Sequence, residues 1–233
     1  MSKLLEIEAL HAWYGASHVL HGVNLAMDEG EVLALSGRNG SGRSTLARAI
    51  MGLVRWQGTA SFRGVALAGM RPFRIARLGV GYVPEARDIF PTLTVRENLL
   101  LGAKPRARRF TLDDAHRLFP ALRERDAVKA GALSGGEQQM LALARTLVGD
   151  PELVIIDEPA EGLAPQVVAQ VVACLAALQQ RGVAILLIEQ RMTIARAIGH
   201  RVAVMGHGAI VFDGSLDALA ADARTTSEWL SAG

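Results

Sequence analysis

Cysteine, lysine, aromatic residues and long apolar runs are all scarce in this chain of 233 residues. The single cysteine, Cys174, excludes an intrachain disulfide and fits a reducing compartment. The formal net charge of only +2 gives little general attraction for nucleic acid, and we expect no nucleic-acid partner. No apolar run approaches the ~20 residues that cross a bilayer, and the first ten residues lack a signal-peptide pattern. We therefore expect a soluble, intracellular chain.

Hydrophobic residues and glycine, in contrast, are plentiful. Residues of the AVILMFWYC set make up 50% of the chain, which excludes a disordered protein, and 24 residues are glycine. The basic residues are almost all arginine, because Lys3, Lys104 and Lys129 are the only lysines. At ~150 residues per domain, the length allows one large domain or two small ones.

Apolar strands and amphipathic helices alternate along most of the chain, which predicts an α/β fold with a parallel sheet covered on both faces. Between residues 92 and 133 the strand pattern disappears, and we predict a helical subdomain inserted into an α/β core of residues 1–91 and 134–233. The expected strands cover residues 4–10, 19–27, 31–36, 153–156 and 183–188, and the expected core helices cover residues 44–54, 136–148 and 165–180.

A glycine-rich segment, GRNGSGRST, follows one apolar strand and opens a helix, which is the context of a phosphate-binding loop. Glycines let backbone N–H groups curl around phosphate oxygens, and the helix N-terminus adds its positive dipole. The hydroxyl of Ser44 is placed to bind Mg²⁺. An ordinary strand-to-helix turn is the alternative, and Arg43 stands where this loop pattern has lysine. The predicted nucleotide-binding residues are Gly37, Arg38, Asn39, Gly40, Ser41, Gly42, Arg43, Ser44 and Thr45.

Two further motifs follow the loop. A second apolar strand ends in Asp157 and Glu158, at the strand end where open α/β sheets bind ligands. Asp157 is predicted to hold Mg²⁺ and Glu158 to act as general base. In Leu-Ser-Gly-Gly-Glu-Gln, Ser134 and Glu137 fit a helix cap, but a cap alone does not explain the two glycines between them.

These three motifs, in this order, resemble the ATP-binding subunit of ABC transporters over nearly the whole chain. The resemblance implies a P-loop NTPase fold with a RecA-like parallel sheet core, an N-terminal antiparallel β subdomain and the inserted helical subdomain. It implies ATP and Mg²⁺ as ligands and ATP hydrolysis as the activity. The family's signature motif, which meets the γ-phosphate of ATP on a partner subunit, corresponds to Ser134, Gly135, Gly136 and Glu137.

The same resemblance gives roles to three more residues. Tyr14 matches the aromatic residue that stacks on adenine, Glu85 the Q-loop residue near the metal, and Gln190 the switch residue. Glu85 replaces the usual glutamine and Gln190 the usual histidine. Gln190 can donate a hydrogen bond to the γ-phosphate but cannot carry the imidazolium charge. We count Glu158 and Gln190 as catalytic, and Ser44, Asp157 and Glu85 as metal ligands.

Residues 83–85 and 90–99 are similar to the branched-chain amino acid subgroup and its urea and amide relatives. The subgroup implies an importer motor on the cytoplasmic face of the inner (cell) membrane. Its partners would be separate transmembrane permease subunits, a second ATPase subunit in a homodimer or heterodimer, and, indirectly, an extracytoplasmic solute-binding protein.

Arg43 leaves two alternatives open, since arginine is the default cation of this chain. The site either hydrolyses ATP slowly, or it binds nucleotide with little turnover and acts as a regulatory subunit. The remaining aromatic residues receive structural interpretations. We interpret His11, His18 and His21 as surface or strand-packing residues, and Trp56 and Trp229 as packing residues.

Overall fold

A six-stranded sheet and a four-stranded sheet form the framework of the computed structural model, which describes residues 3–104, 109–199 and 201–230. The larger sheet has the order β10-β9-β3-β8-β7-β6, and every neighbouring pair from β9 to β6 is parallel. Its strands are β3 (Val32–Gly37), β6 (Val80–Val83), β7 (Leu153–Asp157), β8 (Ala184–Ile188), β9 (Arg201–Gly206) and β10 (Ala209–Ser215). The α/β class with a parallel core is confirmed.

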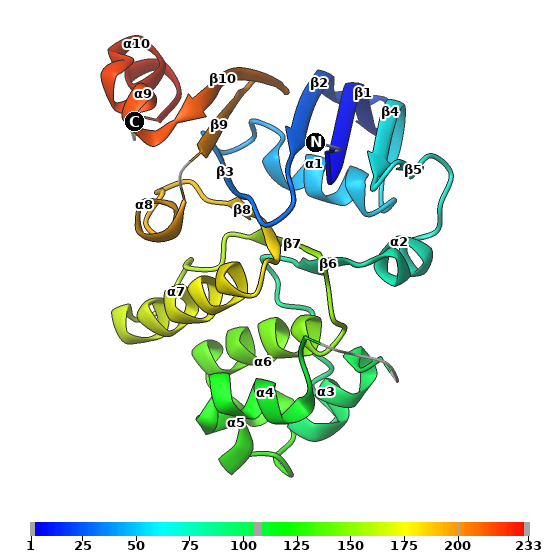
Figure 1. Cartoon of the computed structure of the whole chain (residues 1–233), viewed down its shortest axis with the longest axis vertical. Coiled ribbons are helices and arrows are strands. Elements are labelled where there is room, and N and C mark those ends of the chain that lie inside the picture. The colour runs from blue at the N-terminus through cyan, green and yellow to red at the C-terminus, as the bar shows by residue number, and fades with distance from the viewer. Residues whose placement is uncertain (1–2, 105–108, 200, 231–233) are drawn as a thin grey trace.

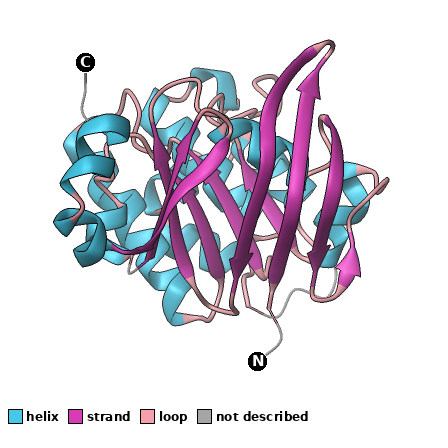
Figure 2. Cartoon of the chain, turned by 90° about the horizontal axis from the view of Figure 1, so that it is seen from above, coloured by secondary structure: helices cyan, strands magenta, loops and turns pink. Residues whose placement is uncertain are grey.

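The smaller sheet is antiparallel and lies at the N-terminal end of the chain, side by side with the larger sheet (Figure 2). Its order is β2-β1-β4-β5, and its strands are β1 (Leu5–Tyr14), β2 (Ser17–Met27), β4 (Arg55–Phe62) and β5 (Val65–Ala66). The side chains that it buries share one core with β3 and the helix that follows β3, so this sheet braces that helix.

Strand β1 continues four residues beyond the expected end at residue 10, because a bulge resets its pattern. Leu5 and Ile7 are buried before the bulge, and Leu10 and Ala12 after it. Ala9 has a φ of +46°, and a Cβ on the opposing Gly58 would lie only 2.3 Å from the Ala9 carbonyl oxygen. A glycine at position 58 therefore makes the bulge possible.

Helices cover the sheets in two groups. Helix α1 (Arg43–Ile50) packs between the two sheets, and α7 (Pro165–Gln180) and α8 (Ala195–Ile198) cover the opposite face of the parallel sheet. The other elements are α2 (Pro72–Leu78), α3 (Val95–Gly102), α4 (Leu112–Leu118), α5 (Pro120–Glu124), η1 (Ala130–Ala132), α6 (Gly135–Leu147), α9 (Leu216–Ala221), α10 (Ala223–Thr225) and the π-helical turn η2 (Thr226–Leu230).

Helices α3, α4, α5 and α6 gather at the end of the molecule away from the antiparallel sheet (Figure 1). Helix α6 packs against α3, and so the helix after the Ser-Gly-Gly motif lies among these helices. A second expected bound is also wrong: the helix predicted over residues 44–54 ends at Ile50, because Gly52 takes a φ of +67° that terminates it. Of the helices in the described ranges, none is both long and apolar enough to cross a bilayer.

Candidate functional site

The glycine-rich loop joins the buried strand β3 to helix α1 and leaves the first N–H groups of that helix free of side-chain caps. Gly37 and Gly42 take φ values of +145° and +105°, and a Cβ on Gly37 would lie 2.3 Å from the Met205 carbonyl oxygen. The first turn of α1 carries no acidic residue. The loop therefore has the uncapped amides and glycine backbone that bind an anion.

A cavity of 510 Å³ opens beside this loop and brings together most of the residues predicted for the site. Seven residues of the loop and the helix start line it, and three carboxylates and an amide from other elements face them. Its lining comprises Val19, Asn39, Gly40, Ser41, Gly42, Arg43, Ser44, Thr45, Glu85, Glu158, Glu161 and Gln190. Gly37 lies at the end of β3, and Arg38 lines a neighbouring cavity.

Arg43 and Glu158 form an ion pair within this cavity. Arg43 donates from Nη1 to Oε1 of Glu158 at 2.7 Å, and from Nη2 to Oδ1 of Asn39 at 3.4 Å. The two side chains are 7% and 16% exposed, so the pair is largely shielded from water. The backbone N–H of Gln190 donates to the other oxygen of Glu158 at 3.3 Å. Glu158 has a φ of +47°, an uncommon conformation for a residue with a side chain.

Ser44 and Asp157 form the oxygen-rich part of the site. The Ser44 hydroxyl donates to Oδ1 of Asp157 at 3.1 Å, and Asp157 is 1% exposed. Burial raises the pKa of Asp157 to about 6; the charges of Glu158 and Glu85 add to the rise, while Ser44 and Arg43 oppose it. A buried carboxylate beside two other acids and a hydroxyl is a donor set that suits Mg²⁺.

The protein groups do not form a closed metal cage. Within the described ranges, no three His, Cys, Asp or Glu side chains converge closely enough to hold a metal by themselves. An ion at Ser44 and Asp157 would need oxygen atoms from elsewhere, and Mg²⁺ commonly takes these from water and substrate phosphates. Glu85 lines the cavity and acts on Asp157 through its charge.

Tyr14 does not line the cavity. It ends β1, is 42% exposed, and its hydroxyl accepts a hydrogen bond of 3.2 Å from Arg48 of α1. Val19 of β2 lines the cavity on that side instead.

The Ser-Gly-Gly motif forms the capped start of α6. Ser134 and Glu137 make a reciprocal capping box: Glu137 N–H donates to the Ser134 hydroxyl at 3.3 Å, and Ser134 N–H donates to the Glu137 carboxylate at 2.8 Å. A Cβ on Gly135 would lie 3.1 Å from Arg87, and one on Gly136 would lie 2.8 Å from Val167 of α7. Close packing accounts for the glycine at 136. None of these four motif residues lines the cavity of its own chain.

Glu189 precedes the switch residue Gln190, and the sequence indicated no role for it at the site. It is 2% exposed, and its carboxylate accepts N–H bonds of 3.0–3.1 Å from Ile194 and Ala195. Burial raises the pKa of Glu189 despite these bonds, and the charge of Glu158 adds to the rise. Glu189 orders the turn that carries Gln190. Its position directly after the apolar strand β8, like that of Glu158 directly after β7, is the signal that could have indicated its role.

Comparison with known proteins agrees with this geometry. Residues 20–161 match the ABC transporter family. The chain is 35% identical to the high-affinity branched-chain amino acid transport ATP-binding protein BraG of Pseudomonas aeruginosa, over 97% of this chain and 99% of that one. It is 33% identical to the probable branched-chain amino acid transport ATP-binding protein LivF of Archaeoglobus fulgidus, over 93% and 94%.

Solved structures resemble the fold over nearly its full length. The ATP-binding subunit of an ABC transporter superposes with a TM-score of 0.82 at 30% identity, covering 93% of this chain and 91% of that one. The ADP conformation of MJ1267, an ATP-binding cassette of an ABC transporter, superposes with a TM-score of 0.82 at 25% identity, covering 97% and 98%.

Proposed function

Because this chain belongs to the ABC transporter family, as its ATP-binding subunit, we propose that it hydrolyses ATP to drive import of branched-chain amino acids or a related small solute such as an amide or urea. Relatives named for branched-chain amino acid transport, with 33–35% identity over almost the whole chain, support the importer type. The amino acid substrate rests on those relatives, since permease and solute-binding subunits select the solute in this family.

The observation that carries ATP hydrolysis is the shared cavity. One space of 510 Å³ is lined by the anion-binding loop, by Glu158 directly after β7 and by Gln190 after β8, although the loop lies more than 100 residues before the other two in sequence. An ordinary glycine-rich turn would not gather Glu158 and Gln190 around it. Convergence of a phosphate cradle, a carboxylate base and a hydrogen-bond donor is the arrangement that phosphoryl transfer to water requires.

Each residue then has a chemical task. The loop amides and the start of α1 bind the β- and γ-phosphates of ATP, and Arg43 neutralises their charge. Glu158 takes the proton of the attacking water, and the Gln190 side chain donates a hydrogen bond to the γ-phosphate. Ser44 and Asp157 are the residues that would hold Mg²⁺, with Glu85 close by. Bound Mg²⁺ supplies charge neutralisation during phosphoryl transfer.

The site requires a second ATPase subunit to be complete. Ser134, Gly135, Gly136 and Glu137 would contact ATP bound to the loop of that second subunit. Movement of the two subunits would be transmitted to transmembrane permease subunits at the cytoplasmic face of the cell membrane, where this chain would sit peripherally. An extracytoplasmic solute-binding protein would deliver the solute. The second subunit would be a copy of this chain or a different ATPase.

One observation favours a second candidate function. Arg43 bonds to Glu158, the proposed base, so the same cation must serve both the phosphates and the base. If Arg43 keeps Glu158 from accepting a proton, the chain would bind ATP without appreciable turnover and act as a regulatory subunit.

Single-turnover ATP cleavage by the purified chain, alone and mixed with the second ATPase of its transporter, separates the two candidates. The motor predicts Mg²⁺-dependent release of phosphate that a Glu158→Gln variant loses. If the chain is a regulatory subunit, it should bind ATP tightly but cleave none, whether it is alone or mixed with the second ATPase. Absence of ATP binding to the wild-type chain would contradict both.

A further inference from the structure

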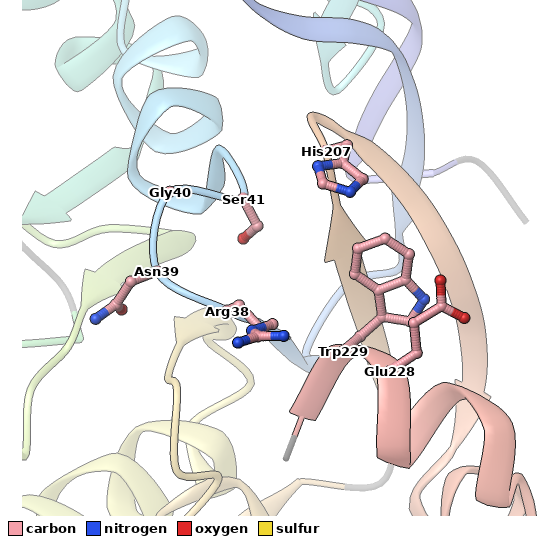
Figure 3. Close-up of a pocket in the computed structure, with 7 residues that line it drawn as sticks. All are labelled: Arg38, Asn39, Gly40, Ser41, His207, Glu228 and Trp229. Atoms are coloured by element: carbon pink, nitrogen blue, oxygen red, sulfur yellow. The ribbon is translucent and has the colours of Figure 1, made fainter. Parts of the chain in front are cut away.

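The C-terminal turn η2 lies beside the phosphate loop. The indole of Trp229 and the ring of His207 form one side of a cavity of 310 Å³, and residues 38–41 form the other side (Figure 3). This cavity differs from the nucleotide cavity but shares Asn39, Gly40 and Ser41 with it. The loop therefore has two flanks: one faces the nucleotide cavity and the other faces the C-terminal turn.

Trp229 is seated on the turn between β9 and β10. Its six-membered ring covers Gly206 so closely that a Cβ there would lie 2.5 Å from the ring. The ring also meets His207 edge to face, with centroids 5.1 Å apart and an interplanar angle of 84°. Aromatic edge-to-face contacts of this kind are favourable. Trp229 thus contacts the β9–β10 turn at two successive residues.

That turn is bonded directly to the phosphate loop. Gly208 N–H donates to the carbonyl oxygen of Ser41 at 3.0 Å, and His21 N–H of β2 donates to the carbonyl oxygen of Gly208 at 2.8 Å. At the other end of the loop, the Met205 carbonyl lies so close to Gly37 that a side chain there would collide with it. Residues 205–208 therefore touch the loop at both of its ends.

Side chains hold the loop at Asn39, Arg43 and Ser44, but not at Ser41 and Gly42. The Ser41 hydroxyl is buried but has no hydrogen-bond partner, and Gly42 caps α1 without a side-chain bond. The Ser41 carbonyl oxygen instead accepts a hydrogen bond from Gly208 of the β9–β10 turn, and the indole of Trp229 packs on Gly206 at the start of that turn. An anion-binding loop works when its N–H groups are already aimed at the phosphate, because ordering them on binding would cost affinity.

We infer that Trp229 is a positioning residue, which braces the phosphate loop through the β9–β10 turn and so keeps it ready for nucleotide. The inference rests on the proposed function in that it takes the loop as the ATP site. It gives Trp229 a role in positioning the loop, whereas the sequence alone led us to interpret Trp229 as a packing residue. The route runs from the indole to Gly206 and His207, then through the Gly208–Ser41 hydrogen bond.

Peptide-resolved hydrogen exchange on the nucleotide-free protein tests the brace without ATP. Trp229→Ala should increase exchange of the amides in residues 38–45, and Trp229→Phe, which retains a ring over Gly206, should restore most of the protection. Trp56→Ala is the matched control, because Trp56 is a partly buried tryptophan of β4 that packs on the core beneath the antiparallel sheet. Unchanged exchange in the loop of Trp229→Ala would overturn the inference.

The kinetic readout is a split between KM and kcat. Trp229→Ala should raise the KM for ATP by about fivefold to tenfold while changing kcat much less, since residues along a coupled network alter affinity by such factors. Trp56→Ala should leave KM unchanged. If Trp229→Ala alters KM no more than Trp56→Ala does, the brace is wrong. A wild-type chain that binds no ATP would contradict the proposed function. The hydrogen-exchange experiment would still show whether Trp229 positions the loop.

Gly206→Ala gives a second route, in case truncation of Trp229 prevents folding. Its methyl group would push the intact indole off the turn, so loop exchange and KM should rise as in Trp229→Ala. The double variant Gly206→Ala with Trp229→Ala should be no worse than Trp229→Ala alone, because the clashing ring is gone. Fully additive effects would show that the two residues act on the loop independently and would overturn the inference.

Discussion

Arg43 reaches across the nucleotide cavity and places its guanidinium 2.7 Å from the carboxylate of Glu158. The cation belongs to the phosphate loop and the carboxylate follows β7, so the pair connects the residues proposed for binding and for catalysis. Each charge compensates the other in a shielded environment. A bound γ-phosphate would compete with Glu158 for the same guanidinium.

Replacing Arg43 with lysine should raise turnover. A lysine ammonium is a point charge that can sit between phosphates, whereas the planar fork of arginine can hold Glu158 at the same time. We expect Arg43→Lys to increase single-site ATPase activity by about tenfold, which corresponds to ~1.4 kcal/mol of transition-state stabilisation. Steady-state release of phosphate measures the turnover of each variant. Arg38→Lys is the control, because Arg38 lies in the same loop but outside the nucleotide cavity; unchanged turnover in Arg43→Lys would contradict the prediction.

Removing the charge of Glu158 should separate ATP binding from hydrolysis. Glu158→Gln keeps the shape of the side chain but cannot accept the proton of water, so turnover should fall by about 10²- to 10⁴-fold. The variant should still bind ATP, and titration with a fluorescent ATP analogue measures this binding. Glu161→Gln serves as the control, because Glu161 lines the same cavity. Equal losses in the two variants would mean that Glu158 has no special role.

Local chemistry made much of this architecture predictable from the sequence. The helix predicted over residues 165–180 has those bounds in the structure, because a proline at its first position and polar residues at its end mark it locally. The glycine-rich loop and the acidic strand were also recognisable from short patterns. Contacts between segments that are distant in sequence could not be predicted in this way. The Arg43–Glu158 pair spans 115 residues of sequence, and the seat of Trp229 on Gly206 requires knowing how β9 meets η2.

Asp157 should make the nucleotide-free protein less stable as the pH rises. Its folded-state pKa, about 6, lies above the ordinary value of 3.8, because burial disfavours its charged form. A raised folded-state pKa contributes stability below pH ~4 that is lost as the pH rises through 6. Relative to Asp157→Asn, the unfolding free energy of the wild type should fall by about 2–3 kcal/mol between pH 4 and pH 7. Urea unfolding without Mg²⁺ measures this; a difference that stays constant with pH would refute it.

Glu189 should support both the fold and the switch turn. Its buried carboxylate accepts the N–H groups of Ile194 and Ala195, and truncation would leave these donors without a partner. Glu189→Ala should lower the unfolding free energy by about 1–3 kcal/mol, as expected for buried unpaired polar groups. Glu6→Ala, at an exposed position of β1, is the comparison. A loss no larger than that of Glu6→Ala would show that the carboxylate is dispensable.

Complementation between two inactive variants tests whether the Ser-Gly-Gly motif works on a second chain. Ser134 lies outside the cavity of its own chain, and Ser134→Arg should therefore block hydrolysis without preventing ATP binding. In a two-fold homodimer, a chain carrying Glu158→Gln still offers an intact Ser134 to the loop of a chain carrying Ser134→Arg. Mixing the two inactive proteins should then restore about a quarter of wild-type ATPase activity, since half of the dimers are mixed and each has one complete site. If the motif served its own loop, neither chain would contain a complete site, and the mixture would stay inactive.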